Sequence, residues 1–115
     1  MTAAITPRQF ADTYVEIVNR GAYSKLADLF ASDAMFLGPG GRVIEGREAI
    51  RAFYDGFLPE IRPTIRISSY VERGADCVYE LEAEIVGQDG FSLAAIDHAT
   101  FGADGLVMRL AVFTK

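Results

Sequence analysis

The sequence predicts an α+β fold: a cone-shaped domain of a curved antiparallel sheet packed against about three N-terminal helices. Two observations predict this class. Apolar residues recur at helical spacing in the first half of the chain, whereas they alternate at strand spacing in the second half. Helices followed by a meander of strands are typical of domains in which helices cover one face of an antiparallel sheet. A curved sheet closed by helices would enclose an apolar pocket.

The length and composition indicate one globular unit. The chain has 115 residues, half of them apolar, with no linker, repeat or low-complexity stretch, so we expect a single domain over residues 1–115. Its net charge of −5 argues against nucleic acid or an anionic membrane as a partner. We find no signal peptide and no apolar run near the ~20 residues of a membrane span. We therefore expect a cytoplasmic protein.

The first predicted helix begins at Thr6 and Pro7, because threonine caps helix N-termini and proline suits the first helical position. Gly21 can end this helix in a left-handed conformation. Ser24 is expected to cap a second, short helix. The inward face of the first helix is predicted from residues at helical spacing: Phe10, Tyr14, Ile17 and Val18.

A pair of short strands is predicted next, over residues 34–37 and 43–45, with the glycine-proline turn 38–41 between them. A third helix is expected from Arg47 to about Leu58, ending at Pro59. Its inward face would carry Ile50, Phe53, Tyr54 and Phe57.

The longer strands follow, over residues 64–73, 77–86, 91–101 and 106–114. The second of them alternates most regularly, with Glu80, Glu82 and Glu84 on the face opposite to its apolar residues. Its inward residues are predicted to be Tyr79, Leu81, Ala83 and Ile85.

Asp97 is the most informative polar residue. Along its strand the same face carries Phe91, Leu93, Ala95, Ala99 and Phe101, so alternation places its carboxyl on the apolar face. Burial disfavours the ionised form, so we expect a raised pKa and a neutral acid that can donate a hydrogen bond. The alternative is a structural ion pair with Arg109 or Arg66. The pattern alone leaves both interpretations open.

Two tyrosines share this inward orientation. Tyr14 lies on the apolar face of the first helix and Tyr54 on the inner face of the third. A buried phenol needs a partner for its hydroxyl, which in most proteins is a backbone carbonyl. Together with Asp97, the two tyrosines could instead converge as hydrogen-bond donors in an apolar pocket, the usual form of a small-molecule site.

Cys77 and His98 are the single cysteine and the single histidine of the chain. A lone thiol cannot close an internal disulfide, so Cys77 is interpreted as buried and inert. Because a metal site would need a cluster of such ligands, we expect no metal and no cofactor. His98 points opposite to Asp97, which favours a place on the sheet surface or at a dimer interface.

At these residues the chain resembles the ketosteroid isomerases, within the larger SnoaL-like group of proteins similar to nuclear transport factor 2. The similarity covers nearly the whole chain, and the joint placement of Tyr14, Tyr54 and Ile96-Asp97-His98 is its specific part. The other similar stretches are Val15 to Asn19, Gly21, Leu29-Phe30-Ala31, Asp33-Ala34, Pro39, Gly46, Ala49-Ile50-Arg51, Phe53, Phe101, Gly105 and Met108-Arg109.

The resemblance implies roles for these residues. Tyr14 and a protonated Asp97 would form an oxyanion hole, with Tyr54 supporting Tyr14; ketosteroid isomerase is a known case of a carboxylic acid held neutral in an apolar site. The family's general base is an aspartate just before the proline that matches Pro39. Here that position is Gly38, which has no ionisable side chain.

The leading functional prediction is therefore a ketosteroid isomerase-like enzyme. It would move the double bond of a 3-oxosteroid or similar enone through a dienolate, with weak turnover because the base is absent. The alternative is a non-catalytic binding protein for a steroid, a phenol or another apolar small molecule. A third interpretation is a polyketide cyclase or an epoxide hydrolase, although the Asp-Arg-Asp arrangement that a hydrolase would need is not recognisable.

The partners expected are an apolar, steroid-like ligand and a second copy of the chain, since the resemblance implies a homodimer. The ligand-binding residues expected on the inward strand faces are Leu81, Leu93, Ala95, Met108, Leu110 and Val112.

Overall fold

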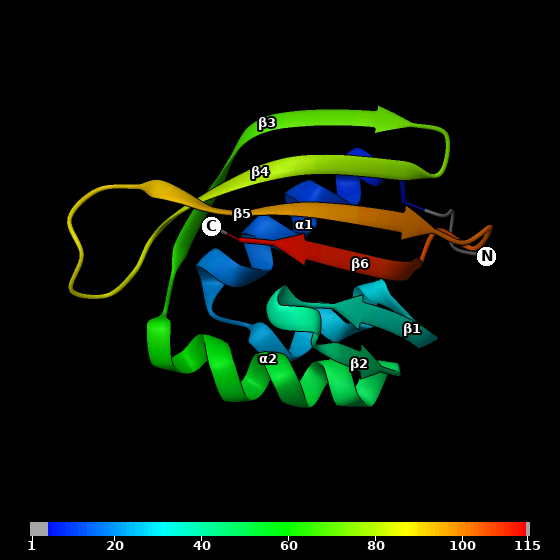
Figure 1. Cartoon of the computed structure of the whole chain (residues 1–115), viewed down its shortest axis with the longest axis horizontal. Coiled ribbons are helices and arrows are strands. Elements are labelled where there is room, and N and C mark those ends of the chain that lie inside the picture. Colours follow the sequence, from blue (N-terminus) through cyan, green and yellow to red (C-terminus); the bar gives the residue numbers. More distant parts are fainter. Residues whose placement is uncertain (1–4, 115) are drawn as a thin grey trace.

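Helices precede the long strands in the computed structural model, which describes residues 5–114. Figure 1 shows α1 behind the strands and α2 beneath β1 and β2. The helical segments are α1 (Pro7–Arg20), the 3₁₀ segments η1 (Tyr23–Leu29) and η2 (Pro39–Gly41), and α2 (Arg47–Ile61). The strands are β1 (Phe30–Leu37), β2 (Val43–Glu45), β3 (Thr64–Arg73), β4 (Asp76–Glu84), β5 (Ser92–Phe101) and β6 (Val107–Phe113).

The start and end of α1 confirm the predictions from its capping residues. Thr6 accepts a hydrogen bond from the backbone N–H of Gln9 at 3.1 Å, and the Gln9 side chain accepts one from the Thr6 N–H at 2.8 Å. Pro7 is the first helical residue, and Gly21 ends the helix with φ of 78°. This local chemistry fixes where α1 begins and where it ends.

Two predictions about helix ends were wrong. Ser24 caps nothing, because η1 begins one residue earlier, after Ala22, without a side-chain cap. Helix α2 does not stop at Pro59 but continues to Ile61. Proline removes only its own N–H, and the next turn still closes, since the Arg62 N–H donates to the Leu58 carbonyl at 2.8 Å.

The sheet is mixed, which corrects the antiparallel sheet expected from the sequence. Its strand order is β2-β1-β6-β5-β4-β3, and every neighbouring pair is antiparallel except β1 and β6, which run parallel. The last strand returns beside the first after a long excursion through α2 and the β3–β5 meander. Local alternation carries no information on the relative direction of strands so distant along the chain.

Three β-bulges interrupt the ladders of the long strands. The unpaired residues are Ser68 in β3, Ala94 in β5 and Met108 in β6. A bulge bends its strand and increases its twist. The sheet therefore curves around the helices without closing into a barrel.

The core lies between the concave face of the sheet and the two α-helices. Cys77 is a buried free thiol, as expected, and burial raises its pKa to about 11. Asn19 ties α1 to the edge strand β3, because its side-chain amide bonds both the carbonyl and the N–H of Ile65, at 2.9 and 2.7 Å. Within residues 5–114, no helix is long and apolar enough to span a bilayer.

Candidate functional site

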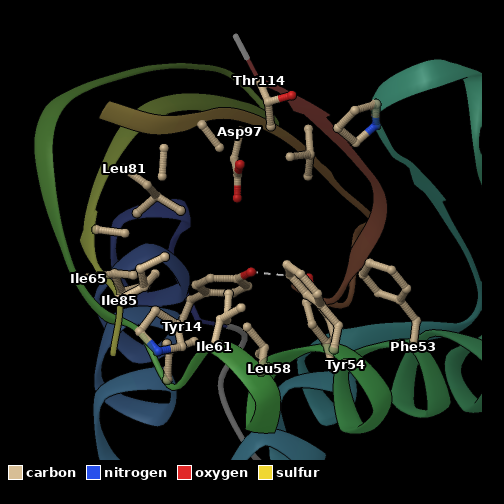
Figure 2. Close-up of a pocket in the computed structure, with 18 of the residues that line it drawn as sticks. Tyr14, Phe53, Tyr54, Leu58, Ile61, Ile65, Leu81, Ile85, Asp97 and Thr114 are labelled. Atoms are coloured by element: carbon tan, nitrogen blue, oxygen red, sulfur yellow. Dashed lines mark hydrogen bonds between the residues drawn. The ribbon is translucent and has the colours of Figure 1, made fainter. Parts of the chain in front are cut away.

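A cavity of about 520 Å³ opens between the concave sheet face and the helices (Figure 2). Its wall is largely apolar, and α1, α2 and every strand except β2 contribute to it. The lining residues are Tyr14, Val18, Phe36, Pro39, Arg42, Phe53, Tyr54, Phe57, Leu58, Ile61, Pro63, Ile65, Leu81, Ala83, Ile85, Ala94, Ala95, Asp97, Val112 and Thr114.

Tyr14 and Tyr54 form a hydrogen-bonded pair on the helical wall. The Tyr14 hydroxyl donates to the Tyr54 hydroxyl at 3.2 Å, and the two rings meet edge to face. Tyr14 thus finds a second phenol where most buried tyrosines find a carbonyl. Burial raises the pKa of both hydroxyls, and the nearby Asp97 carboxyl adds to the effect, so both stay protonated donors.

Asp97 projects into the cavity from the opposite wall, facing the tyrosine pair (Figure 2). Its side chain is 1% exposed, and neither carboxyl oxygen has a hydrogen-bond partner among the described residues. The ion pair considered as the alternative does not form. Arg66 pairs with Glu82 at 2.7 Å, and Arg109 lies on the exposed outer face of the sheet.

Burial raises the pKa of Asp97 to about 7, which confirms the expectation of a raised pKa. Tyr79, its register partner on β4, partly opposes this shift, because its hydroxyl can donate to the carboxylate. That hydroxyl is itself buried and makes no hydrogen bond within residues 5–114, so the contact between the two side chains is looser than a hydrogen bond. Near neutral pH a substantial fraction of Asp97 is therefore a neutral acid able to donate.

Gly38 lies at the rim rather than in the cavity wall. It has extended backbone with φ of −96°, and it lines a neighbouring hollow with Pro39 and β6. A Cβ at this position would lie 3.1 Å from Cε1 of Phe36 and 3.6 Å from Cβ of Arg42. Because both neighbours line the cavity, a side chain at position 38 would sit at its mouth.

Apart from Asp97, no described residue that lines the cavity carries a carboxylate. Asp33 and Glu45, the nearest carboxylates in sequence, are exposed and lie outside the lining.

Half of the predicted ligand-binding residues reach the cavity. Leu81, Ala95 and Val112 line it. The other three predicted residues lie outside the lining, for two physical reasons. The bulges at Ala94 and Met108 shift the inward-outward alternation of their strands. Leu93 is therefore 38% exposed and Met108 is 51% exposed. Phe91, which was predicted to share the face of Asp97, also lies outside the lining. Leu110 does point inward, but it is fully buried in the core and outside the lining.

The sequence analysis did not single out Phe36 or Arg42 as site residues, although it predicted that Phe53 faces inward. Phe36 and Phe53 pack with their rings tilted by 46° and their centroids 5.0 Å apart, and the Arg42 guanidinium lies 5.4 Å from the Phe53 centroid. Alternation could have identified Phe36, because neighbouring residues of a strand point to opposite faces and Met35 points outward. Nothing in the sequence marked Arg42, because it lies in a loop.

His98 lies outside the site, as its alternation with Asp97 predicts. Its Nε2 is 3.1 Å from Oδ1 of Asp76, which also accepts a hydrogen bond from Thr100 at 2.6 Å. These contacts, the Thr100 bond first, lower the pKa of Asp76. Within the described part of the chain, no group of three or more His, Cys, Asp or Glu side chains could hold a metal ion.

Comparison with known families identifies the class of protein. The family model for the SnoaL-like domain matches residues 11–110, and the chain therefore belongs to the SnoaL-like domain family. No curated protein matches the chain.

Solved structures show the same fold. A nuclear transport factor 2-like protein of unknown function from Cytophaga hutchinsonii has a TM-score of 0.77 at 17% identity, covering 100% of this chain and 95% of its own. A candidate ketosteroid isomerase from Kribbella flavida has a TM-score of 0.78 at 20% identity, covering 94% of this chain and 76% of its own. SalBIII, an epoxide hydrolase/cyclase-like enzyme in pyran ring formation in salinomycin, has 0.77 at 22% identity, with coverages of 94% and 89%.

These identities establish the nuclear transport factor 2-like fold and nothing finer. Because this fold carries many unrelated functions, the chemistry has to be argued from the site.

Proposed function

We propose that the protein is a ketosteroid isomerase-like enzyme with weak activity. It would shift the double bond of a β,γ-unsaturated 3-oxosteroid or a similar enone into conjugation. One observation carries the proposal. The buried carboxyl of Asp97 has no hydrogen-bond partner within the described structure, and it faces the Tyr14–Tyr54 pair across an apolar cavity.

In the proposed reaction, the carbonyl oxygen of the substrate accepts hydrogen bonds from Tyr14 and from protonated Asp97. Tyr54 then donates to the Tyr14 hydroxyl and keeps it oriented. Negative charge develops on that oxygen as a proton leaves the α-carbon, so both donors bind the dienolate more strongly than the ketone. The apolar wall excludes water, which strengthens these hydrogen bonds.

The proton itself has no protein carrier at position 38. A base would take it from one carbon and return it to another, and its contribution is typically ~10²–10⁴ in rate. With Gly38 in that place, water or a bound carboxylate has to carry the proton. The proposal therefore expects slow turnover rather than none.

The decisive experiment restores the base. Gly38→Asp should raise the steady-state formation of conjugated enone by about 10² or more. The backbone at Gly38 is extended and suits any residue, and the ring of Phe36 has to give by only a few tenths of an ångström. Gly38→Asn is the matched control, since it adds the same bulk without a base and should give no comparable gain.

A second substitution tests whether base and donors act together. Tyr14→Phe in the Gly38→Asp background should remove most of the gain, because both groups act on one transition state. If Gly38→Asp folds normally but turns over no faster than the Asn control, the cavity is not organised for isomerisation.

The second candidate is a binding protein for an apolar molecule with an oxygen at one end. The absence of any carboxylate other than Asp97 from the described cavity lining favours it. The fold supports this role elsewhere, since a computationally designed 17-OHP binder matches with a TM-score of 0.75 at 19% identity, covering 92% of this chain and 88% of its own. Ligand binding without any gain from Gly38→Asp would select this candidate.

Homodimer formation and a cytoplasmic location remain proposals. The outer face of the sheet carries exposed Met35, Met108 and Phe113, an apolar surface that a second copy could cover. Sedimentation velocity would distinguish a dimer from a monomer.

A further inference from the structure

Arg42 stands out among the residues that line the cavity. It lies in the loop between η2 and β2, and its guanidinium sits over the ring of Phe53, 5.4 Å from the centroid. Of the lining residues, only Arg42 and Asp97 are of charged types. Asp97 lies in the buried interior, whereas Arg42 is exposed at the mouth. The cavity thus has one polar end inside and one cationic end outside.

No acid within residues 5–114 forms an ion pair with Arg42. Four of the other eight arginines do form such pairs: Arg8 with Asp12, Arg20 with Glu16, Arg51 with Asp28 and Glu48, and Arg66 with Glu82. Among the remaining arginines, only Arg42 lines the cavity. In a chain with 16 acidic residues, an arginine at a cavity mouth without an acidic partner is available to a ligand.

The stem of Arg42 lies beside Gly38. A Cβ added at Gly38 would lie 3.1 Å from Cε1 of Phe36, a tight contact, and 3.6 and 3.8 Å from Cβ and Cδ of Arg42. The space that a side chain at position 38 would fill therefore lies against Arg42, at the edge of the cavity.

We propose that the cavity selects elongated apolar carboxylic acids, with an oxygen held by Tyr14 and Asp97 inside and the carboxylate paired with Arg42 at the mouth. The contact of the ligand oxygen with Tyr14 and Asp97 rests on the proposed function. The contact of the carboxylate with Arg42 rests on the placement of Arg42 alone.

Both charge and geometry suit Arg42 to bind a carboxylate. A net charge of −5 repels anions at long range, so an acidic ligand needs a cation at the site itself. A guanidinium matches a carboxylate with two parallel N–H donors, and such charge-assisted pairs are the stronger hydrogen bonds. The Phe53 ring shields one face of the guanidinium, which limits its freedom and its hydration.

Three aromatic probes of one scaffold test the proposal by calorimetric titration. They are 2-naphthol, 6-hydroxy-2-naphthoic acid and the methyl ester of that acid. All three offer a phenolic oxygen to the inner end, but only the acid carries a negative charge at its other end. The wild-type protein is expected to bind the acid about three- to tenfold more tightly than the ester, and the preference should fall at high ionic strength.

Two variants locate the origin of the preference. Arg42→Gln should bind acid and ester equally, while its affinity for 2-naphthol stays within about twofold of wild type. Arg73→Gln is the matched control, because it makes the same change in net charge at an exposed residue outside the cavity lining. It should keep the preference for the acid.

The outcomes separate this inference from the proposed function. Binding of 2-naphthol without any preference for the acid overturns the role of Arg42 and leaves the inner site intact. A preference that persists in Arg42→Gln also overturns it. Failure of all three probes to bind overturns both the inner oxygen site and the inference that rests on it.

Discussion

Three buried polar atoms without partners gather at one part of the sheet: the two carboxyl oxygens of Asp97 and the hydroxyl of Tyr79. An unsatisfied buried polar group costs about 1–3 kcal/mol in water-excluded surroundings. A ligand oxygen that accepts from protonated Asp97 would give this carboxyl a hydrogen-bond partner. Tyr79 lies opposite Asp97 in the β4–β5 register and is positioned to orient its carboxyl.

The pKa of Asp97 should depend on Tyr79. The Tyr79 hydroxyl favours the ionised carboxylate, whereas burial, the larger effect, favours the neutral acid. Tyr79→Phe should therefore raise the pKa of Asp97 above its value of about 7. Carbon-13 NMR titration of the aspartate carboxyl groups measures the change.

Tyr70→Phe is the control for this substitution. Tyr70 stacks on Tyr79 with ring centroids 6.5 Å apart, but its own hydroxyl donates to Glu72 at the surface. An equal shift of the Asp97 pKa in both variants would mean that ring packing, not the Tyr79 hydroxyl, sets it.

At the residue scale, the sequence predicted the orientation of side chains better than their hydrogen-bond partners. Alternation correctly placed Asp97 inward, and helical spacing did the same for Tyr14 and Tyr54. Spacing alone could not predict that the tyrosines bond each other, which only the family resemblance implied, or that Tyr79 lies opposite Asp97, because register between strands depends on the tertiary structure.

At the scale of elements, the accuracy of prediction followed the range of the interactions involved. The capping box at Thr6 and the glycine at position 21 act within one turn, and both ends of α1 were predicted correctly. A bulge depends on the neighbouring strand, and one inserted residue reverses all the side chains beyond it. Leu93 and Met108 were misplaced for this reason.

Asn19 should contribute to stability through the contact between α1 and β3. Asn19→Ala would remove both hydrogen bonds to Ile65 and leave its partly buried backbone groups without their partners. We expect a loss of about 1–3 kcal/mol in the free energy of unfolding, measured by urea denaturation.

Glu16→Gln on the same helix is the control for Asn19→Ala. It disturbs only an exposed ion pair with Arg20, which is worth about 0–1 kcal/mol. Because α1 also carries Tyr14, Asn19→Ala should weaken naphthol binding as well. An unfolding free energy equal to that of the control would show that the Asn19 bridge is not needed to dock the helix.

For the whole molecule, the fold class was predicted and the sheet topology was not. Helices on a curved sheet follow from the two periodicities of the sequence, but the parallel pairing of β1 with β6 joins residues at opposite ends of the chain. This pairing brings Phe36 beside β6, and it places the Gly38 loop next to Val112 at the mouth of the cavity. The sequence analysis therefore could not predict the mouth of the cavity or the position of Arg42 in it.

The buried acid should also shape the stability of the whole molecule as a function of pH. The folded protein keeps the Asp97 proton up to about pH 7, whereas the unfolded chain loses it near the ordinary aspartate pKa of ~3.9. Between these values the unfolded state binds fewer protons, so stability falls as pH rises. The lowered pKa values of Glu48 and Asp76 act in the opposite sense, and their stabilisation is lost only as the pH falls through the acidic range.

Asp97→Asn isolates this effect, because the amide has nearly the same shape and no charge, and other titrating groups are common to both proteins. From pH 5 to pH 8, wild type should lose about 2–3 kcal/mol relative to Asp97→Asn, since each pH unit below the folded-state pKa of about 7 is worth ~1.36 kcal/mol. Urea denaturation at the two pH values gives the difference. Parallel stability curves for the two proteins would mean that Asp97 ionises in the folded state as easily as in water, and the donor assigned to the oxyanion hole would then be absent at neutral pH.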